Sequence, residues 1–430
     1  MSKRRITVGA TAASLLAAAA ITAGAIVPAN ADLAPQKKDV VGVGSDALQN
    51  AFDFLADGVK IGGKTYQGYN ETAAAKKWRF DDIDASGDAN GTATTDGTVV
   101  LRNGTSPVQR PYGGSQGLAA LEADGANGKD ADLIDFARAT AALTATDEST
   151  AEANLGTHLD WVTLATDTDY IATTTTTHAP SVLTPAEILA IYTGKVKTWS
   201  DLAAYRAANE PTLPAYTPDS SWAGNTIVAF YPQNGAGMQK VFFSGLTAAN
   251  NGTTPSATTL TNGIQVKQND PTTLLDPSKA VNPATGVSLG LKSTQADDVI
   301  VPIPQSKYNL FKAGYYLDGS KPYSAASGSQ SKLATTGWQL LTGSGSFTST
   351  VQFDAVFRDK DFTSKAGWQP GSKLNWVKTL FWNPAYNPAK KKNKVAAPYA
   401  FSKTGQAILK ALGLTVQPYA TAFNSWTAAK

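Results

Sequence analysis

Four short loops of glycine, serine and polar residues are the stretches whose residue types could bind a small ligand. In the first, Asp39–Gly58, valines that favour a strand precede glycines that allow a tight turn, and Ser45 or Asp46 can cap the helix that follows. Such a loop directs free backbone N–H groups and the positive end of a helix dipole at one point, which suits a small anion. Three further stretches repeat the pattern: 108–121, 131–143 and 226–246. Loops of this kind meet at one edge of an open α/β sheet and build a ligand site there.

Two of these loops also match enzyme motifs, and both matches lack necessary partners. G-x-G-x-x-A at 42–47 fits a dinucleotide fingerprint, but no convincing second strand with an acidic residue follows at the required distance. G-x-S-x-G at 113–117 fits a nucleophile elbow around Ser115. A hydrolase of that type needs a late histidine, whereas the chain has only His158 and His178, which we interpret as surface or packing residues. The sequence therefore predicts that the protein is not an enzyme.

Neither a metal site nor a cofactor is predicted. Acidic residues and Asn90 alternate from Asp82 as in a calcium loop, but Ala93 stands where a bidentate glutamate is required, so we interpret the stretch as a polar turn. The chain has no cysteine, which excludes disulfides and thiolate ligands. Tryptophans near the C-terminus leave open a sugar-binding surface, although packing is the commoner role of this residue.

The first 31 residues have the composition of a signal peptide. Basic residues precede the apolar run 8–27, and Ala29–Ala31 is a small-residue cleavage site. We expect cleavage after Ala31, with an uncleaved anchor as the alternative, and no other run is long enough to span a bilayer.

The whole chain has 37 basic and 34 acidic residues, and the leader carries three of the basic ones and none of the acidic ones. The exported chain is thus nearly neutral, which argues against nucleic acid or an anionic membrane as a partner. The absence of cysteine also rules out a lipid-modified cysteine at the cleavage site, so we expect the protein to be secreted, either free or associated with the cell wall.

Several elements can be placed along the chain. The stretch 170–177 is rich in β-branched residues and predicts a strand that crosses between two lobes. A helix follows at 184–193, with a capping threonine, proline at its first position and glutamate three residues after the cap. Strands are expected at 226–231 and 299–303, and a late helix near 403–412.

In this order, the loops give the chain a resemblance to the phosphate-type substrate-binding proteins of ABC importers, particularly their exported actinobacterial branch. The stretches that carry it are GVGSDALQ at 42–49, RPYGGSQGLAAL at 110–121, IDFARATAAL at 134–143, LTPAEILAIYTGKVKTWSDL at 183–202, YPQNGAGMQKVFF at 231–243 and IVPIPQSKY at 300–308. The resemblance implies an α/β, two-lobed periplasmic-binding-protein-like fold of class II that closes about a hinge. Lobe one would comprise 40–172 plus 301–430, and lobe two 173–300.

The resemblance also implies a ligand site. Its first two loops would bind the anion through Gly44, Ser45 and Asp46 and through Ser115, Gln116 and Gly117. In the third loop, Thr140 stands where the family has an acidic residue, and Arg138 would balance the ligand's charge. The fourth loop lacks the family's arginine and both hydroxyls, and its contacts would come from Asn234, Gly235, Ala236 and Gly237. Arg110 is a second candidate for the missing positive charge.

We therefore expect a secreted, monomeric solute-binding protein for phosphate or another small oxyanion, with an ABC transporter permease as a candidate partner. The alternative is a secreted protein that keeps the fold but binds the cell wall or another surface polymer.

Overall fold

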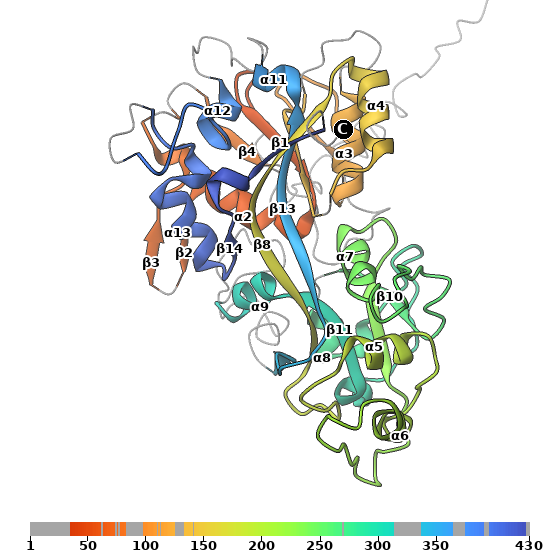
Figure 1. Cartoon of the computed structure of the whole chain (residues 1–430). Coiled ribbons are helices and arrows are strands. Elements are labelled where there is room, and N and C mark those ends of the chain that lie inside the picture. Colours follow the sequence, from red (N-terminus) through yellow and green to blue (C-terminus); the bar gives the residue numbers. More distant parts are fainter. Residues whose placement is uncertain are drawn as a thin grey trace, which may run out of the picture. The chain divides into compact units, whose positions relative to one another are not determined.

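The computed structural model of the chain describes residues 35–61, 63–73, 75, 78–82, 98–109, 111, 113–124, 133–140, 142–268, 271–313, 337–363, 375–390 and 395–426. The predicted signal peptide, most of the calcium-like stretch and Arg110 lie outside these ranges. Residues 34–430 form one compact unit, and Figure 1 labels its elements.

A mixed sheet forms the framework. Its strands follow the order β10-β9-β11-β8-β13-β7-β1-β4, and β12, β14 and β15 also pair with β8. Strands β1, β4 and β7 run parallel, as do β9, β10 and β11, whereas β8 is antiparallel to every strand it pairs with. The strands of this sheet are β1 (Val40–Gly44), β4 (Phe80–Asp82), β7 (Phe136–Ala139), β8 (Leu159–Thr174), β9 (Val228–Pro232), β10 (Ile264–Val266), β11 (Val299–Pro304), β12 (Trp338–Leu340), β13 (Thr348–Arg358), β14 (Thr415–Val416) and β15 (Phe423–Ser425).

Two small hairpins stand apart from that sheet, β2 (Val59–Ile61) with β3 (Lys64–Tyr66) and β5 (Thr98–Val99) with β6 (Val108–Gln109). The helices are α2 (Asp46–Asp57), α3 (Gly114–Ala123), α4 (Ala145–Leu155), α5 (Pro185–Tyr192), α6 (Trp199–Asn209), α7 (Gly237–Gly245), α8 (Pro271–Leu275), α9 (Gln305–Lys312), α11 (Asp359–Thr363), α12 (Trp376–Leu380) and α13 (Lys403–Ala411). In the described part of the chain, none of the helices combines the length and the apolar character needed to cross a bilayer.

The long strands β8 and β13 join the two halves of the sheet. They pair from Leu159 to Tyr170, and Figure 1 shows them running side by side. Beyond that ladder, β8 continues beside β11 and β12. Both faces of each half are covered, because separate clusters of buried apolar side chains lie on them.

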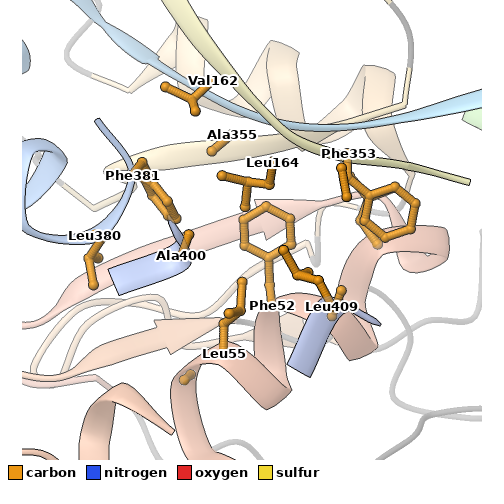
Figure 2. Close-up of a cluster of buried hydrophobic side chains, with 14 of the residues drawn as sticks. Phe52, Leu55, Val162, Leu164, Phe353, Ala355, Leu380, Phe381, Ala400 and Leu409 are labelled. Carbon is orange, nitrogen blue, oxygen red and sulfur yellow. The ribbon is translucent and has the colours of Figure 1, made fainter. Parts of the chain in front are cut away.

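Helix α2 packs into the largest of these clusters through Phe52. The Phe52 ring stacks on that of Phe136, with centroids 5.5 Å apart, and neither side chain is exposed. Figure 2 shows Phe52 close to Leu164 of β8 and Leu409 of α13. The C-terminal part of the chain therefore helps to hold the helix that begins at the first predicted ligand loop.

The predicted α/β fold is confirmed, as are the predicted elements at 184–193, 226–231, 299–303 and 403–412, to within a few residues. The predicted strand at 170–177 proves to be the end of the much longer β8. The boundaries of the two lobes stay a prediction.

Candidate functional site

The first loop requires glycine at position 44. Gly44 has φ +124°, and a Cβ there would lie 2.7 Å from the carbonyl oxygen of Arg138. Ser45 follows as N-cap of α2, and its hydroxyl accepts a hydrogen bond from Ala47 N at 3.3 Å. The Ser45 amide itself donates to the Arg138 carbonyl at 3.2 Å. The first loop is thus bound directly to the end of β7.

The second loop begins α3 and packs onto the first. A Cβ at Gly117 would lie 2.3 Å from the Cα of Gly44, so only glycine permits this approach. Gly113, with φ +87°, faces the fourth loop, because a Cβ on it would lie 3.2 Å from the Gly235 carbonyl oxygen. The third and fourth loops meet likewise: a Cβ at Gly237 would lie 2.2 Å from Thr140 Oγ1. All four predicted loops therefore converge.

A pocket of about 70 Å³ opens at this junction, large enough for a small anion or a few waters. We call it the α3–α7 pocket, because the first residues of both helices line it. Three of the predicted ligand residues, Ser115, Thr140 and Gly237, belong to its wall. The full lining is Gly114, Ser115, Leu118, Ala139, Thr140, Ala142, Leu143, Asp147, Gly237 and Lys240.

Positive potential in the pocket comes from two sources. The first residues of α3 and α7 line the pocket, and neither helix has a side-chain cap, so the positive ends of two helix dipoles lie there. Lys240, one turn into α7, adds an exposed ammonium group that has no hydrogen-bond or ion-pair partner among the residues described. Together these groups can hold an anion.

Negative charge is present on the same wall. Asp147 Oδ2 accepts hydrogen bonds from the backbone N–H and hydroxyl of Thr144, both at 2.7 Å, in the capping box of α4. Glu122 of α3 is nearby, and burial together with the charge of Asp147 raises the pKa of Glu122 to about 7. An anion in the pocket would thus face one carboxylate as well as the cationic groups.

Arg138 lies beneath the first loop. Its side chain is fully buried, and it donates from Nε to the Ser45 carbonyl at 3.0 Å and from Nη2 to the Gly44 carbonyl at 3.1 Å. The guanidinium therefore supports the backbone that carries the predicted ligand contacts, and it does not line the α3–α7 pocket. Its predicted role in balancing a ligand's charge stays a prediction.

The other predicted ligand residues lie around the junction. Asp46 accepts a hydrogen bond from the Gln268 side chain, which links α2 to the segment after β10. Asn234 is exposed and its Oδ1 accepts from Gln239 and Gln265 at 3.1 and 3.0 Å. Gln116 is exposed, and Ala236 is the buried residue immediately before α7.

Lys240 and Asp147 were missed by the sequence analysis. Lys240 stands three residues after Gly237, where one helical turn returns it to the same face. Asp147 completes a T-x-x-D capping pattern with Thr144, and that pattern would have placed the start of α4. Neither signal by itself points to a ligand.

Each of the two histidines contacts at least one carboxylate side chain. His158 Nδ1 lies against Glu148 and Glu152 of α4, and His178 Nδ1 lies 2.7 Å from Asp298 Oδ1. The ring of His178 also stacks on Trp222, with centroids 4.3 Å apart. Neither histidine lines the α3–α7 pocket with Ser115, as a hydrolase would require.

Comparison with known proteins gives likeness in structure only. No protein-family model matches the sequence, and no curated protein does. A putative phosphate ABC transporter substrate-binding protein from Clostridium perfringens, solved with bound phosphate, has a TM-score of 0.41 at 12% identity, over 88% of this chain and 100% of its own. An ABC-type phosphate transport receptor from Vibrio cholerae has a TM-score of 0.39 at 12% identity, over 88% and 100%. An ancestral soluble variant of the human phosphate binding protein has a TM-score of 0.45 at 13% identity, over 91% and 92%. At these identities the similarity is limited to the fold, and it gives no information about the ligand.

Proposed function

We propose that this protein is a solute-binding protein that holds a small oxyanion, with phosphate as the first candidate, in the α3–α7 pocket. The observation that carries the proposal is the convergence of two uncapped helix N-termini and Lys240 on one small pocket. The hydroxyls of Ser115 and Thr140 lie on the same wall and can donate to anion oxygens.

Asp147 favours an anion that still carries a proton. A carboxylate in the wall repels a fully ionised ligand but accepts a hydrogen bond from an O–H group. Phosphate near neutral pH keeps one proton, whereas sulfate has none. We therefore expect the pocket to prefer phosphate to sulfate.

The wider setting belongs to the same proposal. Residues 1–31 would be the signal peptide, and the secreted monomer would close its lobes, 40–172 plus 301–430 and 173–300, about the strands that cross between them. Gly44, Ser45, Asp46 and Asn234–Gly237 would complete the ligand contacts on closure, and Arg138 would add its charge from beneath the first loop. An ABC transporter permease would receive the anion. Membership of the actinobacterial branch stays a prediction.

Calorimetric titration of phosphate into the stripped mature protein tests the proposal. We expect a dissociation constant near micromolar, about −8 kcal/mol, and weaker binding of sulfate.

Because a hydrogen bond to a charged group contributes about 1.5–3 kcal/mol, Lys240→Gln should weaken phosphate binding about 10- to 100-fold. Lys279→Gln, on a short turn that does not line the pocket, is the matched control. Absence of heat and of thermal stabilisation at millimolar phosphate would refute the proposal.

The surface-polymer alternative gains no support from the tryptophans. Four of them, Trp78, Trp199, Trp338 and Trp376, have no exposed surface. Trp382 stacks on Tyr419 and on Phe423, with centroids 4.1 and 5.5 Å away, so its faces are not open to a sugar. Trp368 lies outside the described residues, and Trp426 is half-buried. The packing of the other tryptophans favours the oxyanion proposal over the surface-polymer alternative.

A further inference from the structure

The end of α4 and the start of β8 bring one histidine to two glutamates. Glu148 and Glu152 are four residues apart on α4 and so lie on one face of the helix. Gly156, with φ +63°, ends the helix and turns the chain back, which places His158 beside both carboxylates. His158 Nδ1 lies 3.1 Å from Glu152 Oε1 and also contacts Glu148 Oε1. One ligand atom from each residue lies within 4.8 Å of the other two. We call these three residues the α4–β8 cluster; none of them lines the α3–α7 pocket.

The cluster combines a fixed ligand with two accessible ones. Glu148 is only 2% exposed, and its second oxygen, Oε2, accepts a hydrogen bond from Leu159 N at 3.2 Å, which fixes the carboxylate. The side chains of His158 and Glu152 are 36% and 46% exposed, so an ion can approach from solvent and keep a water ligand.

A further buried carboxyl group lies close to the cluster in sequence. Asp160, two residues beyond His158, is 1% exposed, and its Oδ1 has no hydrogen-bond partner among the residues described. Asp160 is thus a buried carboxyl next to the α4–β8 cluster, where a divalent cation would add positive charge.

We propose that Glu148, Glu152 and His158 bind one Zn²⁺ ion. Imidazole nitrogen and carboxylate oxygen are both zinc ligands, at about 2.0–2.2 Å, and a site of three protein ligands leaves a fourth position for water. The imidazole favours zinc over magnesium or calcium, which prefer oxygen ligands alone. The ion would tie the last turns of α4 to the residue that precedes β8 and so stabilise the start of that strand. Zinc and a proton compete for Nδ1, so binding should weaken as the pH falls.

The test is zinc uptake by the exported form of the chain, prepared without a histidine tag, in phosphate-free buffer. Competition with a chromophoric chelator at pH 7.5 should give one bound zinc per chain, and zinc should raise the melting temperature. Uptake should fall at pH 5.5. A wild-type protein that takes up no zinc at tens of micromolar, and does not shift in melting temperature, would overturn the proposal and leave the cluster as a structural contact between His158 and the two carboxylates.

Variants locate the site. Glu152→Gln changes an exposed side chain and should keep the fold, and it should lower zinc affinity at least about 10-fold, as should His158→Gln. Glu71→Gln, an exposed glutamate in the turn after β3, is the matched control and should bind as the wild type does. Wild-type affinity in both cluster variants would place any bound zinc elsewhere and overturn the assignment. Circular dichroism of each variant separates loss of the ligand from loss of the fold.

Discussion

At the residue scale, Gly117 holds the second loop against the first. A methyl group at this position would meet the backbone of Gly44 at 2.3 Å, and backbone cannot move aside as a flexible side chain can. Gly117→Ala should therefore destabilise the protein by about 1–3 kcal/mol, which is the usual cost of overpacking. Chemical denaturation measures the loss. Gly224→Ala is the control, because a Cβ there would have nothing within 4 Å and Gly224 needs no positive φ. Equal stability of the two variants would show that the loops are not in contact.

The sequence could predict the residues of the loops but not all of the pocket they form. Gly44, Ser115 and Gly237 could be predicted from local patterns, since each lies at a junction where a strand is followed by a helix. Lys240 and Asp147 depend on how α7 and α4 are rotated, and that rotation is set by packing of α7 on β13 and of α4 on α3. A capping pattern or a single lysine does not contain this information.

At the element scale, α5 was the most predictable helix because its start is fixed by its own side chains. Thr184 and Glu187 form the expected capping box, and Pro185 occupies the first position. What the local pattern could not predict is the partner of Glu187. Arg206 of α6 donates to it at 2.6 and 2.9 Å, and also to the Val182 carbonyl at 2.6 Å. The pair joins the two helices inside the protein.

Loss of one charge from this pair should be costly. The side chains of Arg206 and Glu187 are 5% and 0% exposed, so Arg206→Met would leave a buried carboxylate without its cation. We expect a loss of about 3–5 kcal/mol in the free energy of unfolding, measured by urea denaturation. Arg79→Met breaks the exposed pair with Asp57 and should cost less than about 1 kcal/mol. Similar losses in both variants would mean that the Arg206 pair is solvated.

Strand β8 shows why one element was only partly predicted. Its last residues are rich in threonine and were predicted, but its first part contains Asp160, Asp167 and Asp169, all of them buried. Acidic residues in a strand that is buried on both faces interrupt the apolar pattern on which strand prediction depends. Their burial follows from packing on both faces of the sheet and has no local signal.

At the scale of the whole molecule, the sheet order depends on strands far apart in sequence. Strand β13 lies between β7 and β8, and β14 and β15 also return to β8. The resemblance predicted that 301–430 belong to lobe one together with 40–172, and that assignment stays a prediction. The register could not be derived from sequence, because β8 is shared among five partner strands.

This sheet encloses several carboxyl groups whose pKa values are raised by burial. The pKa rises to about 7 for Asp160 and Asp354 and to about 6 for Asp167 and Asp361. In each case loss of hydration is the largest cause, and hydrogen bonds or cations compensate for part of it. These groups belong to β8, β13 and the helix that follows β13, so their ionisation affects the fold as a whole.

Stability should therefore fall as the pH rises from 5 to 8. In this window unfolded aspartates, with a pKa of about 3.9, have lost their protons, whereas the buried native ones still hold theirs at the lower end and must ionise toward the upper end. Asp354, which is 1% exposed, would alone account for up to about 4 kcal/mol between pH 4 and pH 8. Urea unfolding of Asp354→Asn should show a shallower decline than the wild type and greater stability at pH 8. Asp219→Asn, an exposed group whose pKa is lowered by hydrogen bonds from Ser221, should leave the decline unchanged. An Asp354→Asn protein with the wild-type pH profile would mean that this carboxylate is ionised in the native sheet and is stabilised there by solvent.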